Sequence, residues 1–185
     1  KDKDGKLPSV TIDNIKASYE GTKHLINSGL KNLAFIGVNE ENMNAWGERY
    51  TGFVNALKDS GLEADEDLCY FKNLTVKTGY QAIQRFTENN KSFDGIVCAS
   101  DEIAMGAINA LREKGIKVPE DVSVIGFDNN VMGSIFYPKL TTISQPSYDM
   151  GSVAVRMLIK MLNKKELDNP NYVLNYELIK RESTK

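Results

Sequence analysis

Two polar residues that can bind a ligand directly follow apolar runs of the sequence. Ser100 follows GIVCA, and Asp128 follows VSVIGF. Such runs, without polar alternation, are typical of strands that are covered on both faces and belong to parallel sheets. Ligands bind outside the carboxyl ends of these strands, so a hydroxyl and a carboxylate lie where a ligand would sit. The structural alternatives are a serine that caps a helix and an aspartate in a turn.

The segment between these two residues predicts a crossover helix. Ser100 and Asp101 supply short polar side chains for the helix start, and we assign Asp101 mainly to capping. Gly115 ends the helix, because glycine adopts a positive φ without strain. The apolar residues between them recur at helical spacing: Ile103, Ala104, Ala107, Ile108 and Leu111.

The same alternation of strand and helix runs through the chain from its beginning. It predicts an α/β fold, a doubly wound parallel sheet with flanking helices and right-handed crossovers. The expected strands are 9–12, 32–38, 68–71, 95–99 and 122–127, and the expected helices before residue 93 are 16–28, 45–57 and 78–89.

After Phe127 the alternation stops. Residues 128–139 read as a connecting loop, and residues 140–143 as a strand. Residues 146–162 predict a helix with a broad apolar stripe, which needs a surface to cover. Residues 172–180 alternate as one final strand.

Composition and charge exclude several classes of function. The 185-residue chain has a net charge of -2 and a pI near 5.6, so it lacks the clustered basic surface that holds nucleic acid. No apolar run approaches the roughly 18 residues of a membrane helix, and we expect no membrane contact. Cys69 and Cys98 lie in apparent strands, where a free cysteine acts as a small apolar residue. Reduced cysteines indicate a cytoplasmic protein.

No pattern in the chain predicts an enzyme. The segment FIGVNEEN lacks the second and third glycines of a dinucleotide-binding loop, and no metal-ligand spacing appears. A nucleophile with a neighbouring base is also missing. We therefore expect no catalytic residues, no metal site and no cofactor.

Five segments together resemble the LacI/GalR family of bacterial transcriptional repressors, and their order and spacing cover nearly the whole chain. They are HLINSGLKNLAFIG, ERYTGF, SDEIAMGAINALREKGIKVPEDVSVIGFDN, YPKLTTISQP and VLNYELIKRESTK. The family's core is a bilobed fold, similar to periplasmic binding proteins, behind a helix-turn-helix headpiece.

The resemblance implies that the chain is the C-terminal part of this core. Residues 14–144 would form the C-terminal, effector-binding lobe, and residues 1–13 a crossing strand from the N-terminal lobe. Residues 145–185 would hold the hinge crossing, a helix that packs on the N-terminal lobe, and the final strand. The start KDKDGK is neither an initiator methionine nor a secretory signal, so we expect the headpiece and most of the first lobe upstream.

Matching the family's motifs residue by residue implies an effector site. Arg49 matches an arginine that forks onto effector hydroxyls or carboxylates, and Asp128 matches an acidic residue that accepts hydrogen bonds from sugar hydroxyls. Ser100 stands where many relatives carry asparagine. Gln145 matches a polar residue that reaches the cleft, although entry into a helix explains its polarity as well. Leu74 replaces an aromatic residue that stacks on a sugar, and its lack of a flat face puts such stacking in doubt.

We expect Arg49 and Asp128 to lie at the carboxyl edge of the sheet, separated and facing water. A solvated helix arginine is the structural alternative for Arg49. The leading interpretation is the effector-binding and dimerisation region of a DNA-binding repressor, whose effector, a sugar or sugar derivative, shifts the angle between the lobes. Operator DNA would bind to a helix-turn-helix outside this chain. A stand-alone sugar-binding transport receptor shares the fold and remains an alternative.

The chain also resembles the catabolite-control branch of the family, in PSVTID and in QPSYDMGSVAVRMLIKMLNKKELD. That branch binds a serine-phosphorylated phosphocarrier protein, so a protein partner is a second alternative. Arg49 favours the small effector, because that branch often carries lysine at this position. The residues that would contact the phosphoprotein are Tyr148, Val153, Arg156 and Lys160.

We also expect a homodimer. Its interface would use the helix after Asp101 and the loop that carries Phe136. The apolar residues of that helix, among them Ile103, Met105 and Ile108, cover more of its surface than one sheet face requires.

Overall fold

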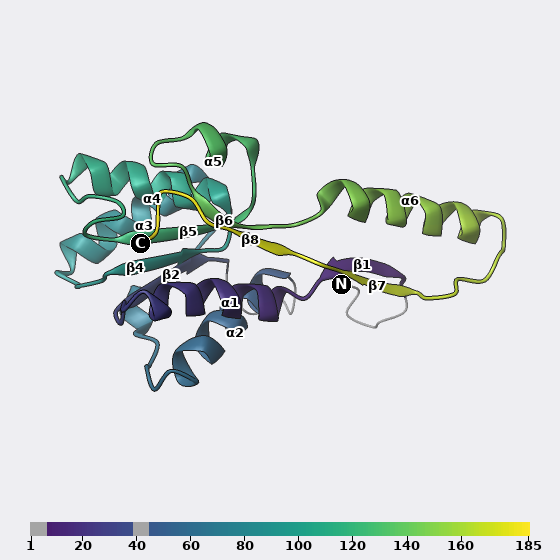
Figure 1. Ribbon diagram of the computed structural model, residues 1–185, viewed down its shortest axis with the longest axis horizontal. Coiled ribbons are helices and arrows are strands. Elements are labelled where there is room, and N and C mark those ends of the chain that lie inside the picture. The colour runs from purple at the N-terminus through teal and green to yellow at the C-terminus, as the bar shows by residue number, and fades with distance from the viewer. Residues whose placement is uncertain (1–6, 39–44) are drawn as a thin grey trace.

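The computed structural model describes residues 7–38 and 45–185. It confirms the α/β class, with helices and strands that follow each other along most of the chain (Figure 1). The strands are β1 (Ser9–Ile12), β2 (Leu33–Gly37), β3 (Cys69–Phe71), β4 (Gly95–Cys98), β5 (Ser123–Asp128), β6 (Thr141–Ser144), β7 (Asn171–Leu174) and β8 (Glu177–Ile179). The helices are α1 (Asn14–Asn27), α2 (Ala45–Lys58), α3 (Val76–Glu88), α4 (Asp101–Glu113), α5 (Val131–Ile135) and α6 (Ser147–Leu162), with a short 3-10 helix at Glu66–Leu68.

The main sheet has the strand order β3-β2-β4-β5-β6-β8. The first five strands are parallel, as predicted, and β8 adds an antiparallel edge. The order reverses between β2 and β4, because the chain first adds β3 on one side of β2 and then continues on the other. In open α/β sheets the crevice at such a reversal is the usual ligand site.

Two helices cover each face of this sheet (Figure 1). α1 packs against α2 on one face, and α3 against α4 on the other. The contact between α3 and α4 is close, because Gly106 lies where a Cβ would be 1.9 Å from the Val76 carbonyl oxygen. The strand β2 between these layers has no polar side chain, and all five of its residues are buried.

A second part of the molecule extends from the main sheet as an arm (Figure 1). It consists of α6 and the two-stranded parallel sheet β1-β7. The chain passes between the arm and the main sheet three times, from β1 to α1, from β6 to α6, and from β7 to β8. The sequence predicted the first two crossings. The single final strand predicted at residues 172–180 is wrong, since it is broken into β7 and β8, which belong to different sheets.

The last residues of the chain return to the main sheet and are buried there. The Val124 amide donates to the Ser183 carbonyl at 2.8 Å, and the Ser183 hydroxyl donates to the Val124 carbonyl at 2.6 Å. The Ser183 hydroxyl also accepts from the Thr141 amide. The tail therefore lies beside β5, next to the start of β6.

The amphipathic helix predicted at residues 146–162 is confirmed as α6, but its stripe is not covered by the described residues. Met157 is the one residue of α6 that is buried. A row of large apolar side chains is exposed instead: Val155, Leu158, Ile159, Met161 and Leu162. No helix among the described residues has the length and apolar character needed to span a membrane.

Two further predictions need correction. Residues 128–139 are not only a loop, because α5 forms within them, with the Asn130 side chain accepting from the Met132 amide. The surplus apolar face predicted for the helix after Asp101 does not exist, since α3 and the sheet enclose α4. As a result, the helix residues proposed for a dimer interface are buried: Ile103, Met105 and Ile108. Phe136 is partly buried.

Candidate functional site

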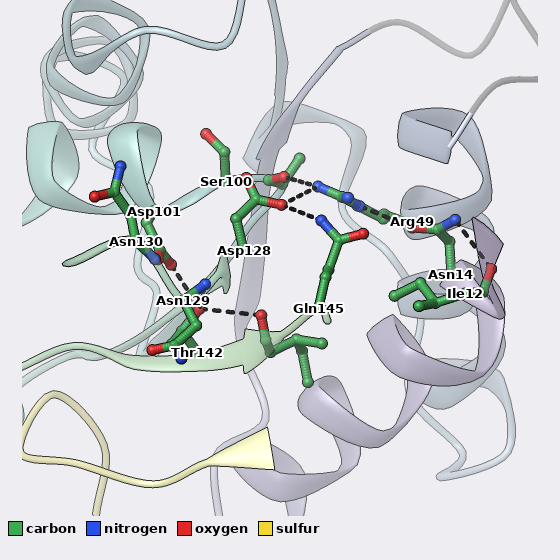
Figure 2. Close-up of polar contacts among 12 residues, drawn as sticks. Ile12, Asn14, Arg49, Ser100, Asp101, Asp128, Asn129, Asn130, Thr142 and Gln145 are labelled. Atoms are coloured by element: carbon green, nitrogen blue, oxygen red, sulfur yellow. Dashed lines mark hydrogen bonds and ion pairs between the residues drawn. The ribbon is translucent and has the colours of Figure 1, made fainter. Parts of the chain in front are cut away.

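The structure brings Arg49, Asp128 and Gln145 together at the carboxyl edge of the sheet (Figure 2). Arg49 comes from α2, Asp128 ends β5, and Gln145 follows β6. Arg49 Nη1 lies 3.5 Å from Asp128 Oδ1, and Gln145 Nε2 donates to the same oxygen at 2.6 Å. The three residues predicted from the family motifs form one polar cluster beyond the ends of β5 and β6, which Arg49 reaches from the helix that follows β2.

Arg49 is buried, not solvated. Its Nη1 donates to the Ala99 carbonyl at 2.5 Å, its Nε donates to Asn14 Oδ1 at 3.2 Å, and its guanidinium lies 3.6 Å from the ring centre of Phe127. Burial lowers the pKa of Arg49 to about 10, and the Asp128 charge opposes this shift. The side chain thus stays charged at neutral pH, oriented by the end of β4 and the start of α1.

Asp128 is the open member of the pair. Its side chain is 41% exposed, compared with 5% for Arg49. Partial burial raises the pKa of Asp128, while Arg49 and Gln145 act in the opposite direction. The expectation that Arg49 and Asp128 are separated and both face water is wrong. They form an ion pair, of which only the carboxylate side offers surface to a ligand.

Asn14 is a member of the cluster that the sequence did not identify. Its Oδ1 accepts from Arg49, and its Nδ2 donates to Glu48 Oε2 at 3.1 Å and to the Ile12 carbonyl at 3.4 Å. Asn14 begins α1 directly after the first crossing, and Gln145 lies in the second. The Arg49 end of the ion pair is therefore bonded to the first chain crossing through Asn14, and the Asp128 end to the second through Gln145.

Ser100 and Leu74 stand outside the cluster. The Ser100 hydroxyl accepts from the Ile103 amide at 3.3 Å, which is the capping role given as its alternative. Leu74 follows β3 and packs against the apolar core. Because β2 and β4 separate β3 from β5, the strand ends that carry Leu74 and Asp128 are about 14 Å apart across the sheet.

Asp101 is not a helix cap. Its side chain is buried, Oδ1 accepts from the Thr142 hydroxyl at 2.6 Å, and Oδ2 accepts from the Asn130 amide at 2.5 Å. Burial raises the pKa of Asp101 to about 6, although both hydrogen bonds favour the ionised form. The assignment of Asp101 to capping is therefore wrong, because Ser100 alone makes the cap.

The surface proposed for a phosphoprotein lies on the arm, apart from this cluster. Val153, Arg156 and Lys160 line a groove between α6 and residues 167–172. Tyr148 and Arg156 border a second, shallower hollow on the same helix. Lys160 Nζ is paired with Asp168 Oδ2 at 2.7 Å. Within the described residues, no group of three or more histidine, cysteine or acidic side chains is arranged to hold a metal ion.

Comparison with known proteins places this geometry in a family. The model of the periplasmic binding protein-like domain matches residues 22–184. A LacI-type transcription regulator from Bifidobacterium animalis subsp. lactis has a solved structure that superimposes with a TM-score of 0.92 at 30% identity, covering 100% of this chain and 69% of that one. The chain belongs to the LacI-type transcription regulators.

Other members are similar over the same range. The present chain is 63% identical over 184 residues to the HTH-type transcriptional regulator RegA of Clostridium saccharobutylicum. The match covers 100% of this chain and 55% of RegA. The solved transcription regulator CcpA of Lactococcus lactis is 36% identical, with a TM-score of 0.92 and coverage of 100% and 67%. A CelR–cellobiose complex is 31% identical, with a TM-score of 0.90 and coverage of 96% and 54%. The chain thus spans about half the length of the curated relative that it matches.

Proposed function

We propose that this chain is the effector-binding and dimerisation region of a bacterial DNA-binding repressor, and that its effector is a sugar or sugar derivative. The observation that carries the proposal is the Arg49–Asp128 pair, which lies at the carboxyl edge of the sheet and is bonded to two crossings. A carboxylate with an exposed side suits the donation of hydrogen bonds by sugar hydroxyls. The CelR relative was solved with cellobiose, which supports the same class of ligand.

The bonds of the pair also give a route from ligand to lobe angle. A ligand hydroxyl that donates to Asp128 Oδ1 competes with Gln145 for that oxygen. Gln145 precedes Pro146 and α6. Release of Gln145 changes the second crossing, while Arg49 remains tied to the first through Asn14. A ligand shifts an equilibrium only by its difference in affinity for the two states. Here that difference arises at the crossing itself.

Two statements about the longer protein follow from this proposal. Residues 14–144, together with the tail from β8, form the C-terminal lobe, and the exposed stripe of α6 is covered by an N-terminal lobe. Operator DNA is bound by a helix-turn-helix outside this chain, in the cytoplasm, where the free Cys69 and Cys98 stay reduced. The stand-alone transport receptor is set aside, because the relatives are named as transcription regulators.

A homodimer remains part of the proposal, with a different surface from the one first expected. α5 and Tyr137, the second residue beyond its end, expose large apolar side chains next to the partly buried Phe136, and such a patch is a reason to expect a partner. Of the three helix residues first proposed, Ile108 lines a pocket together with Tyr137 at this surface. The exposed residues are Val131, Met132, Ile135 and Tyr137.

Calorimetry tests the effector proposal. The intact regulator is titrated with a panel of monosaccharides and disaccharides that includes cellobiose. Asp128→Asn should weaken binding of the responding saccharide by about tenfold or more, since a hydrogen bond to a charged group contributes about 1.5 to 3 kcal/mol. Asp121→Asn, in a loop far from the cluster, is the matched control. Equal affinity of Asp128→Asn and wild type would place the site elsewhere.

The second candidate function is that of a catabolite-control regulator that binds a phosphocarrier protein, and the arrangement of α6 favours it. Tyr148 is 86% exposed. Arg156 is also exposed and lies about two helical turns further along α6, within reach of a bound protein. An arginine beside a lysine suits a phosphoserine. Binding of a serine-phosphorylated phosphocarrier protein that is lost in Arg156→Met and kept in Asp128→Asn would favour this candidate.

A further inference from the structure

The turn after β5 holds two consecutive residues in a backbone conformation that residues with side chains rarely adopt. Asp128 has a φ of 107° and Asn129 a φ of 53°. Such a conformation persists only where surrounding contacts hold it, and it is common at binding sites. The Asp128 carboxylate leaves this turn toward Arg49 (Figure 2). Whatever holds the turn therefore also aims the carboxylate.

Asp101 and Thr142 fasten the turn from below. The Asn130 amide donates to Asp101 Oδ2 at 2.5 Å, and the Asn129 amide donates to Thr142 Oγ1 at 3.3 Å. The Thr142 hydroxyl in turn donates to Asp101 Oδ1 at 2.6 Å. The Asp101 carboxylate thus holds the turn directly through the Asn130 amide, and indirectly, by way of Thr142, through the Asn129 amide.

The packing at the sheet edge leaves space for the Asp101 carboxylate. Asp101 lies at the start of α4, directly beyond β4, and reaches across to β6 beneath the end of β5. The space exists because residue 126 is glycine; a Cβ there would lie 2.2 Å from Asp101 Oδ1. Since Ser100 caps the helix, Asp101 is free to link three strand ends.

We propose that Asp101 is the positioning residue of the site, which fixes the strained turn and so presents Asp128 to Arg49 and to a ligand. The inference rests on the proposed function only in treating Arg49 and Asp128 as the pair that binds effector. Arg181 and Ser144 are competing anchors, since Arg181 Nη2 donates to Asn129 Oδ1 at 2.7 Å and Asn129 Nδ2 donates to Ser144 Oγ at 3.2 Å.

Nuclear magnetic resonance of the labelled 185-residue chain, without any ligand, separates these anchors. In Asp101→Ala, the Asn130 amide should exchange with solvent about tenfold faster or more, because it loses a hydrogen bond to a charged acceptor. The Arg49 Nε–H signal and the Asp128 carboxyl carbon signal should shift with it. Asp101→Asn keeps one acceptor oxygen, which can accept from the Asn130 amide while its Nδ2 donates to the Thr142 hydroxyl, so it should restore protection of that amide and move the signals back toward wild type.

Ser100→Ala is the matched control, because it removes a polar side chain at the neighbouring position of the same helix start. It should release only the Ile103 amide and leave the Asn130 amide and the Arg49 signal unchanged. Wild-type Arg49 and Asp128 signals in Asp101→Ala would overturn the proposal and assign the turn to the side-chain bonds of Asn129 with Arg181 and Ser144.

Thr142→Val provides a second route if Asp101→Ala does not fold. It keeps the volume of the side chain and removes the indirect anchor, so the Asn129 amide should lose protection and the Asp128 signal should shift. Unchanged signals in Thr142→Val would equally overturn the proposal. No ligand enters these measurements, so failure of the saccharide titration leaves their outcome intact.

Discussion

Two amphipathic helices of similar length, α4 and α6, have opposite surroundings. α4 buries nine of its 13 residues, whereas α6 buries Met157 alone among 16. α4 lies between α3 and the main sheet, while α6 stands on the arm near β1 (Figure 1). An apolar stripe therefore predicts a helix that needs a cover, but not which part of a longer protein supplies it. The polar cluster lies where the two regions meet.

The largest effect should separate two leucines of these regions. Leu111→Ala empties a fully buried position of α4 and should lower the free energy of unfolding by about 4 kcal/mol. Leu158→Ala, on the exposed stripe of α6, should change it by less than about 0.5 kcal/mol in the 185-residue chain. Urea unfolding measures both. A large cost for Leu158→Ala in this chain would mean that α6 is covered after all.

A second comparison concerns buried and surface arginines. Arg49→Met leaves Asn14 Oδ1 without its donor and should cost about 3 kcal/mol. Arg85→Met removes a surface arginine 5.7 Å from the Tyr70 ring centre and should cost about 0.5 kcal/mol. Thermal unfolding of both variants decides, and equal melting temperatures would contradict the buried pair.

Helical glycines should respond with opposite signs in the two regions. Gly106→Ala places a methyl group 1.9 Å from the Val76 carbonyl oxygen and should destabilise the chain by about 2 to 3 kcal/mol. Gly151→Ala in α6 meets nothing within 4 Å and should stabilise it by about 0.5 kcal/mol, because alanine favours helix. Chemical unfolding of the pair tests this. Destabilisation by Gly151→Ala would reveal a neighbour on the arm.

A smaller effect should appear in the pH dependence of stability. The folded pKa of Asp101 is about 6, above its ordinary value of 3.8, so folding favours the protonated form. This contribution is fully present below pH 4 and is lost as pH rises through 6, an effect of about 2 kcal/mol between pH 4.5 and 7. The charged groups around Asp101 are Asp128, Arg181 and Arg49.

Asp101→Asn removes this titration, so the difference in unfolding free energy between wild type and variant should change by that amount across the pH range. Asp128, whose pKa is also raised, remains in both proteins and contributes to both stability curves. A difference that is independent of pH would show that Asp101 titrates normally.

Much of the fold could be predicted because apolar runs and helical spacing are local signals. The parallel strands follow from them, whereas the first two crossings were implied by the resemblance to the LacI/GalR family. The third crossing follows from neither, since residues 172–180 alternate without interruption and nothing in their pattern shows that Asn175 and Tyr176 pass between two sheets. Likewise, the spacing within α4 reveals its apolar face but not that α3 covers it.

The site was predictable where a residue type and a strand end coincide, as for Asp128. Asp101 was misread because a polar residue after a strand and before a helix looks like a cap. Its true partners, Thr142 and Asn130, are distant in sequence. Asn14 was overlooked for the same reason: its bond to Arg49 joins residues that become neighbours only when α1 packs against α2.

The most direct test of the account is the effect of saccharide on operator affinity. The intact regulator is bound to an operator selected from random oligonucleotides, and the saccharide identified by calorimetry is added to wild type, Asp128→Asn and Arg156→Met. The account predicts that Asp128→Asn binds the operator within about twofold of wild type but no longer responds, because the variant has lost the charged acceptor at the crossing. Arg156→Met should respond as wild type. A wild-type response of Asp128→Asn, or loss of the response in Arg156→Met alone, would contradict it.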